Sequence, residues 1–371
     1  MEVVQSNRTQ CRKTKQNWWQ RICQGVIIGT SISMLSTLPA MADSRHLAEF
    51  IGTCDASAAV PLGDGRFIVA GDENSRLNIY DWRAPGESKV IDLVGIIPGL
   101  TEEQELDLEG AATIGDTSYW ISSHSRTKGG KLSLERHIFF ALKFTQNKGE
   151  TEAHLVGKAY KNLLKDLTEN ELYRKYKFEN FDKSREAEKA GESEAGFNIE
   201  GLSAWKEGKI WKLLLGLRGP LEDKKAMLIP LENPREVIEG KRPRFGKVVK
   251  LDLDGLGIRG IEFNPGLNKY VILGGSVGKK EGCNIYIWSG KREDGKPGKV
   301  KGVTLVDKFN PEAVFALPDL DKGSVYVLSD DGNQKYHGIK CKDLEESGRI
   351  VFFRGFKLTE AEALNTSTEA N

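Results

Sequence analysis

Short apolar runs recur along most of the chain, and each is bounded by Gly, Asn, Asp or Pro. They are rich in β-branched and aromatic residues, which is typical of β-strands. Five copies of one longer pattern stand out among them. Each copy has an acidic or polar start, a short strand, a polar turn and a second, more aromatic strand. The copies begin at Ser57, Glu109, Glu200, Arg259 and Glu312.

The spacing of these copies predicts an all-β fold. Units of four strands at a period of roughly fifty residues are the signature of a β-propeller. We predict five blades, with six as the alternative if the long gap after the second copy hides another blade. The last copy is one strand short, and residues 46–51 form a surplus strand before the first copy. We therefore expect the N-terminal strand to complete the last blade and close the ring.

The predicted propeller domain covers residues 43–358, with one insertion and a tail. Residues 158–196 are highly charged and carry Leu and Tyr at helical spacing, which predicts a helical insertion. Residues 359–371 are polar, and we expect them to form a disordered tail.

Residues 1–42 read as a secretory signal peptide. Basic residues precede an apolar segment, and Ala40-Met41-Ala42 fits the cleavage rule. An uncleaved anchor is the alternative, but the apolar segment contains Gly, Ser and Thr and makes a poor membrane span. We therefore expect an exported protein, periplasmic or extracellular, with no stable membrane span after cleavage.

Net charge and cysteine content bear on the binding partners and on the cellular compartment of the protein. The formal net charge is +1, which gives no indication of a nucleic-acid-binding surface. Cys54, Cys283 and Cys341 lie outside the predicted signal peptide. An exported protein could form one disulfide from them. Cys54–Cys341 is the first pair to test, because these residues lie near opposite ends of the domain; three buried thiols remain the alternative.

The propeller fold would bring the repeated polar residues together. The first strand of each blade lines the central channel, and the antiparallel second strand returns to the same end. Carboxylates converging there favour a hard cation such as Ca²⁺. The candidate metal ligands are Glu109, Glu200, Glu312 and Asp330, and Asp55 belongs to the same ring.

Basic residues at the same end offer other chemistry. Arg126, Arg218 and Arg259 could neutralise the carboxylates or hold an anionic small molecule. His124 follows a second strand near Glu109 and is the candidate general base. A hydrogen-bonded structural histidine is the competing interpretation.

Several of these motifs resemble a known family. The segments are Asp107-Leu-Glu109-Gly110, Asn198-Ile-Glu200-Gly201, Leu215-Gly-Leu-Arg218-Gly-Pro220, Gly257-Ile-Arg259-Gly260 and Ser329-Asp-Asp-Gly332. Together they resemble the bacterial family known as domain of unknown function 3616, which implies an exported propeller without an established reaction. A weaker resemblance links them to phytase-like esterase propellers, which implies metal-assisted hydrolysis of phosphate or carboxylic esters. The chain departs from that pattern at Arg259 and Ser57, where a symmetric acidic ring would have carboxylates.

Three functions follow as hypotheses. The first is an exported propeller that binds a small ligand or Ca²⁺ at the mouth of its channel. The second is a metal-dependent hydrolase resembling esterases and phosphatases. The third is a protein-interaction scaffold that uses the charged insertion.

Overall fold

The computed structural model describes residues 47–71, 74–127, 129–178, 196–277, 282–303 and 308–367. All of these residues belong to one compact unit. The predicted signal peptide lies outside the described residues, and so does the part of the helical insertion at 179–195. No helix among the described residues is long and apolar enough to cross a membrane.

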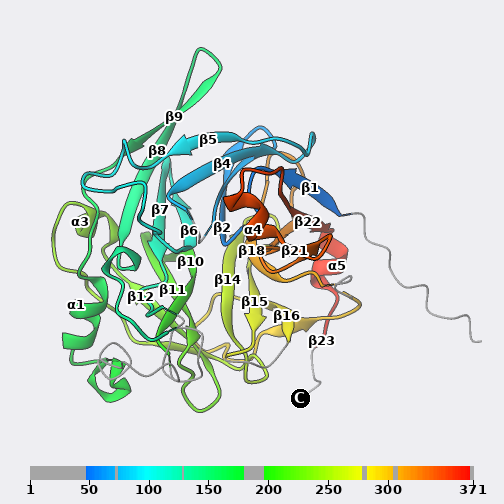
Figure 1. The fold of residues 1–371 in the computed structure, drawn as a ribbon. Helices are drawn as coiled ribbons and strands as arrows, with labels where there is room; N and C mark the ends of the chain where they lie inside the picture. The colour runs from blue at the N-terminus through cyan, green and yellow to red at the C-terminus, as the bar shows by residue number, and fades with distance from the viewer. Residues whose placement is uncertain are drawn as a thin grey trace, which may run out of the picture. The chain divides into compact units, whose positions relative to one another are not determined.

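Five antiparallel sheets of four or five strands form the blades, and a two-stranded sheet lies outside them in the described part of the chain (Figure 1). The first consists of β2 (Ala58–Gly63), β3 (Arg66–Ala70), β4 (Arg76–Asp81) and β5 (Lys89–Asp92). The second consists of β6 (Leu108–Ile114), β7 (Thr117–Ser122), β8 (Phe139–Asn147) and β9 (Glu150–Leu155). The third consists of β10 (Asn198–Glu207), β11 (Ile210–Gly219), β12 (Ala226–Leu231) and β13 (Val249–Leu251).

The last two sheets each use a strand from a distant part of the chain. The fourth consists of β14 (Gly257–Asn264), β15 (Lys269–Gly275), β16 (Cys283–Trp288), β17 (Gly298–Val300) and β23 (Thr366–Ser367). The fifth consists of β18 (Pro311–Phe315), β19 (Val325–Ser329), β22 (Phe352–Leu358) and β1 (Ala48–Ile51).

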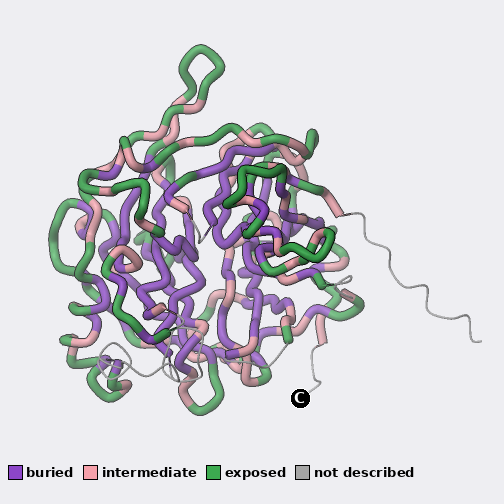
Figure 2. The backbone as a smooth tube through the Cα atoms, in the orientation of Figure 1, coloured by how far each residue is buried: buried purple, intermediate pink, exposed green. Residues whose placement is uncertain are grey.

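The first strands of the five sheets form a closed ring. Each of β2, β6, β10, β14 and β18 contacts the next, and β18 contacts β2. The prediction of a five-bladed propeller is therefore confirmed, and the six-bladed alternative is wrong. The apolar core is divided into clusters that lie between neighbouring blades. Figure 2 shows most strands buried, whereas the tip of the β8–β9 hairpin projects into solvent.

Glycine in the repeated motif lets the first strands approach one another. A Cβ atom at Gly110 would lie 2.9 Å from the Cβ of Leu202 in the next blade. At Gly260 it would lie 2.9 Å from the carbonyl oxygen of Glu312. The Gly that follows each ring residue in three of the five copies is thus required by packing between blades.

The predicted closure by the N-terminal strand is confirmed. β1 pairs with β22 from Ala48↔Gly355 to Ile51↔Phe352. Phe50 of β1 is fully buried, and its ring lies 5.3 Å from those of Phe67, Tyr80 and Phe353. β1 therefore fastens the last blade to the aromatic core of the first blade.

The predicted disordered tail is wrong for residues 359–367. They form α5 (Glu360–Leu364) and β23, and β23 pairs with β17. Thr359 and Glu362 make a capping box at the start of α5, and Ala363 is fully buried. The polar composition of this segment gave no sign that one face of the short helix is buried. Residues 368–371 lie outside the described part of the chain.

The described part of the insertion is helical but not separate from the propeller. It contains α1 (Leu163–Glu169) and the 3-10 helix η2 (Arg174–Tyr176). Leu163, Leu167 and Phe178 are buried in the core between the second and third blades. The short helix α3 (Pro234–Ile238) packs into the same cluster and was not predicted.

A second excursion lies between β19 and β22. It holds the hairpin of β20 (Lys335–Tyr336) and β21 (Ile339–Lys340), followed by α4 (Cys341–Glu346). Cys54 and Cys341, the first pair to test, form a disulfide that joins α4 to the segment before β2, so the alternative of three buried thiols is wrong. Cys283 is a free thiol.

Candidate cation site at the channel mouth

A β-bulge sits at the ring position in four of the five blades. The pairing register between the first and second strands skips Glu109, Glu200, Arg259 and Glu312. A bulge leaves one residue outside the ladder and re-aims its side chain. The repeated motif therefore encodes a polar residue turned out of the ladder, followed by a small residue that packs against the next blade.

Two groups of carboxylates converge at this end of the ring. Oxygen atoms of Glu109, Glu200 and Glu312 lie within 4.8 Å of one another. Oxygen atoms of Asp55, Glu312 and Asp330 also lie within 4.8 Å of one another. Of these five carboxylates, only that of Asp330 belongs to a residue that is not buried. Glu312 belongs to both groups.

The first blade has Ser57 at the ring position, but it supplies a carboxylate two residues earlier. The Ser57 hydroxyl donates hydrogen bonds of 3.1 and 3.0 Å to the two carboxylate oxygens of Asp55. Ser57 thus orients an acid, whereas the second, third and fifth blades carry one in the strand itself.

Two arginines neutralise one side of the ring. Arg218 Nη1 donates a 2.7 Å hydrogen bond to Glu200 Oε1. Arg259 lies between two acids: its Nε is 3.4 Å from Glu200 Oε2, and its Nη2 donates to Glu312 Oε1. Glu200, Arg218, Arg259 and Glu312 therefore form a continuous chain of ion pairs.

Asparagines two residues before the ring positions complete this network. Asn198 Nδ2 donates to Glu200 Oε1 at 2.8 Å. Asn310 Oδ1 accepts from Arg259 Nη1 at 2.7 Å, and Asn310 Nδ2 donates to Asp330 Oδ2 at 3.0 Å. Sequence reasoning missed both residues, although a polar residue stands at the same position in the first and second copies, as Asp55 and Asp107.

Two of the buried carboxylate oxygens in this network accept no hydrogen bond from the described residues. Glu200 Oε2 and Glu312 Oε2 are buried and have no hydrogen-bond partner in the described part of the chain. Burial raises the pKa of Glu312 to about 8, although Arg259 acts in the opposite direction. Burial lowers the pKa of Arg259, but Glu312 and Glu200 outweigh that effect and hold it above its ordinary value. The ring therefore keeps its arginines charged while crowding its carboxylates.

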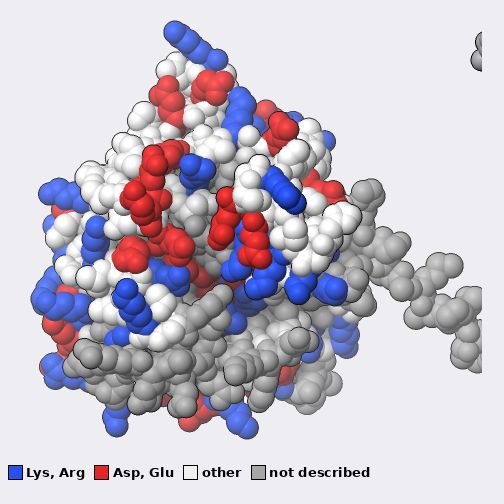
Figure 3. All heavy atoms as spheres, viewed as in Figure 1, with Lys and Arg blue, Asp and Glu red and all other residues white. Residues whose placement is uncertain are grey.

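These side chains border a cavity of about 1240 Å³. Its wall includes Glu109, Glu200, Arg218, Arg259, Glu312 and Asp330. Lys342, Glu345 and Glu346 of α4 also line it. Figure 3 shows acidic and basic side chains gathered around a hollow in this face of the domain. Most of the predicted site residues thus share one cavity.

Arg126 lies on the cavity wall, and a further arginine was missed. Arg126 Nη1 donates to the carbonyl oxygen of Gly130 at 3.1 Å. Arg136 Nη1 lies 3.0 Å from Asp107 Oδ1, and both residues line the cavity. Arg136 stands after a loop rather than at a strand end, so the repeat gave no signal for it.

His124 does not belong to the cavity wall. It is 2 % exposed, its Nδ1 lies 2.9 Å from the carbonyl oxygen of Ser122, and its Nε2 has no partner in the described residues. Its φ of 53° turns the chain after β7. Burial, reinforced by His137, lowers the pKa of His124 to about 3. This placement favours a neutral structural histidine over the predicted general base.

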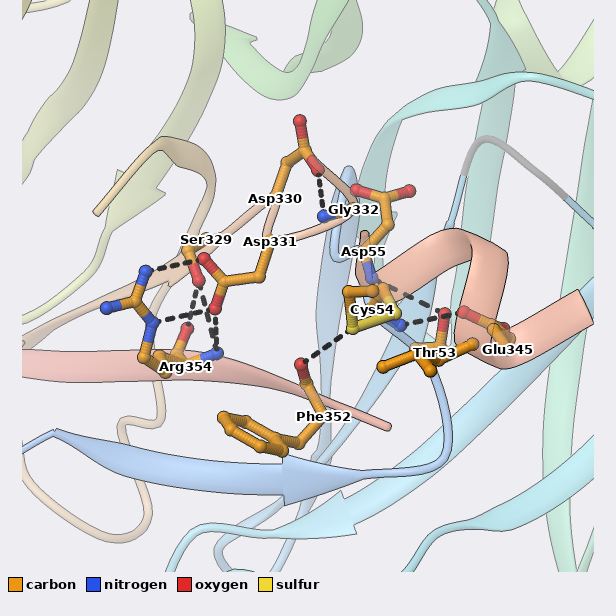
Figure 4. Close-up of a disulfide and its surroundings, with 12 residues drawn as sticks. Thr53, Cys54, Asp55, Ser329, Asp330, Asp331, Gly332, Glu345, Phe352 and Arg354 are labelled. Atoms are coloured by element: carbon orange, nitrogen blue, oxygen red, sulfur yellow. Dashed lines mark hydrogen bonds and ion pairs between the residues drawn. A yellow bond between two sulfur atoms is a disulfide. The ribbon is translucent and has the colours of Figure 1, made fainter. Parts of the chain in front are cut away.

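Asp331, next to Asp330, has a structural partner. Arg354 of β22 donates to both of its carboxylate oxygens, at 2.8 Å from Nε and 2.7 Å from Nη2. Figure 4 shows this pair beside the disulfide, with Asp330 and Asp55 on adjoining segments.

One family model matches the chain. The family model described as "Protein of unknown function (DUF3616)" matches residues 133–319, just over half of the chain. No curated protein matches the chain. The Myxococcus xanthus glutaminyl cyclase structure is 13% identical with a TM-score of 0.38, covering 84% of this chain and 95% of its own.

A second solved structure is similar to the same degree. It is the putative oxidoreductase (glucose dehydrogenase) from Thermus thermophilus, which is 15% identical with a TM-score of 0.40. The match covers 85% of this chain and 100% of that one. At these values the likeness says nothing about the function of the present chain.

Proposed function

The chain belongs to the family of proteins of unknown function DUF3616, and we propose, from its own site, that it is an exported β-propeller that binds Ca²⁺ at the mouth of its channel. The observation that carries this proposal is the position of Glu312. It belongs to both carboxylate groups, it is buried, and its Oε2 has no hydrogen-bond partner in the described residues.

Charge balance supports a bound cation. Among the described residues, Arg218 pairs with Glu200, and Arg259 pairs with both Glu200 and Glu312, whereas the buried Glu312 Oε2 has no hydrogen-bond partner. Burying unpaired carboxylates is costly, because their mutual repulsion and desolvation disfavour the charged forms. A divalent cation offsets both effects, and carboxylate oxygens are the ligands that Ca²⁺ prefers.

The distribution of the arginines indicates where the cation binds. Glu200 is engaged by Arg218 and Arg259, so the first group is largely satisfied as ion pairs. The hydrogen-bond partners of Asp330 include the backbone N–H of Gly332 and the Asn310 amide, which leave its charge in place. We therefore assign the cation to Asp55, Glu312 and Asp330, with Glu109 and Glu200 on the far side of Glu312.

The cavity gives the cation access to a small ligand. Ca²⁺ takes six to eight oxygen ligands, so three carboxylates leave room for water or for oxygens of a bound molecule. The cavity of about 1240 Å³ is large enough for such a molecule. Arg126 and Lys342 on the wall could contact anionic groups of it.

Export is supported by the disulfide, because disulfides persist in oxidising compartments. Cys54–Cys341 fits a periplasmic or extracellular location. Two other functions have less support. The hydrolase loses its candidate base, since His124 does not line the cavity. The scaffold hypothesis loses part of its surface, since α1 packs into the core.

Calcium titration of the purified protein tests the proposal. The Glu312→Gln variant replaces a ligand carboxylate with an amide of the same size, and we expect its Kd for Ca²⁺ to rise by about tenfold or more, which corresponds to about 1.4 kcal/mol. Glu102→Gln is the matched control, because Glu102 is exposed and lies outside the cavity wall. Equal calcium affinity in the wild type and Glu312→Gln would refute this assignment.

A further inference from the structure

Each cysteine of the Cys54–Cys341 disulfide belongs to a chain segment that carries a proposed cation ligand. Asp55 follows Cys54 directly, and Asp330 begins the excursion that contains Cys341. The two cysteines are 287 residues apart in sequence. The disulfide therefore joins the two chain segments that carry Asp55 and Asp330 (Figure 4).

Hydrogen bonds connect the disulfide to both acids. The Asp331 N–H donates to the carbonyl oxygen of Cys54 at 2.8 Å. The Lys342 N–H donates to the Gly332 carbonyl at 3.2 Å, and the Gly332 N–H donates to Asp330 Oδ1 at 2.8 Å. Two successive hydrogen bonds thus connect α4 to the Asp330 carboxylate, so a displacement of α4 would also displace this carboxylate.

Among the described residues, only a small set of buried apolar contacts packs against α4. The disulfide belongs to a small apolar cluster whose buried members are Cys54, Cys341, Leu344 and Val351. Cys54 N–H also donates to Glu345 Oε2 at 2.9 Å. A cluster of this size contributes far less than a blade core, so without the covalent bond α4 should open at low free energy.

Closure of the propeller does not depend on the same bond. β1 pairs with β22 along four residues, and Phe50 anchors β1 in the aromatic core. The ring should therefore survive the loss of the disulfide, whereas the spacing of Asp55 and Asp330 should not.

We propose that the Cys54–Cys341 disulfide positions the cation site and makes calcium affinity depend on redox state. This inference rests on the proposed calcium site. A dithiol reductant transfers two electrons and two protons to the disulfide, giving two cysteine thiols and the oxidised, disulfide form of the reductant. Both sulfurs are buried, so exchange follows local opening of α4. If the site then stays assembled about one tenth of the time, the apparent Kd rises about tenfold.

The test compares calcium titrations of the oxidised protein, the reduced protein and the Cys54→Ser/Cys341→Ser double variant. We expect the last two to bind about tenfold more weakly than the first. The double variant should not respond to reductant, which controls for other thiols and for effects of the reductant on calcium. Equal affinity in the oxidised protein and the double variant would overturn the redox dependence alone. No calcium binding by the oxidised protein would overturn the proposed function as well.

Hydrogen exchange of the same samples decides whether the fold survives. Faster exchange should be confined to residues 53–56 and 331–350, with the blade strands still protected. Global loss of protection in the double variant would overturn the claim that β1 closes the ring by itself.

Discussion

Arg259 provides the sharpest test of the electrostatics of the ring. Its guanidinium lies between Glu200 and Glu312, whose oxygens come within 4.8 Å of each other. The Arg259→Met variant keeps an unbranched side chain as far as the position of Nε and removes the charge. Two carboxylates at that separation repel by about 3.5 kcal/mol at an effective dielectric constant of about 20. Removing one partner of a buried ion pair costs about 3 to 5 kcal/mol. Both estimates predict a loss of about 3 to 5 kcal/mol in the free energy of unfolding.

Denaturant unfolding followed by tryptophan fluorescence measures this loss, because Trp120 and Trp288 are fully buried in different blades. Arg76→Met is the control: Arg76 is largely exposed and lies 4.0 Å from Asp92, so its loss should change stability by at most about 0.5 kcal/mol. Saturating Ca²⁺ should restore more stability to Arg259→Met than to the wild type, since it replaces part of the missing positive charge. Equal stability of Arg259→Met and Arg76→Met would refute this explanation. So would equal stabilisation of Arg259→Met and the wild type by calcium.

Four further outcomes follow from the structure. Phe50→Ala should lower the free energy of unfolding by about 3 to 5 kcal/mol, whereas Glu49→Ala on the exposed face of β1 should have little effect; similar losses would refute the anchoring role of Phe50. His124→Asn, which tolerates the positive φ, should leave calcium affinity unchanged; a loss of tenfold would return His124 to the site. Burial raises the pKa of Glu262 to about 8, so the free energy of unfolding should fall as pH rises from about 4.5 to 8 and the buried carboxyl loses its proton. In Glu262→Gln this fall should be smaller by about 1 to 3 kcal/mol. The same fall in the wild type and in Glu262→Gln would contradict this. Ending the chain at Leu358 should destabilise the protein by about 1 to 3 kcal/mol, because it removes α5 and β23, and an unchanged unfolding curve would show that they contribute nothing.

The fold could be predicted because one short sequence motif recurs along the chain. The ring residue, the small residue after it and the aromatic second strand recur at Glu109, Glu200 and Glu312. Five copies and one surplus strand were enough to predict the blade number and the closure. The disulfide pair was the first to test for a separate reason, because Cys54 and Cys341 lie near opposite ends of the domain, which closure brings together.

The parts that could not be predicted depend on single side chains. His124 stands at a strand exit, as Asp330 does, but its positive φ and its contact with the Ser122 carbonyl hold it away from the cavity. No spacing rule distinguishes these two outcomes. The tail has the same difficulty, because a single buried alanine, Ala363, ties a polar segment to the core.

The departures from five-fold symmetry would explain the position of the proposed cation site. A ring of five identical glutamates would have no reason to bind a cation on one side. Arg259 replaces one acid and, with Arg218, engages Glu200, which leaves that side close to neutral. Ser57 replaces another acid but orients Asp55, so negative charge collects on the opposite side, beside Asp330. The two substitutions that seemed to weaken a metal site in the sequence therefore concentrate the acidic charge around Glu312 and make one position in the ring distinct from the others.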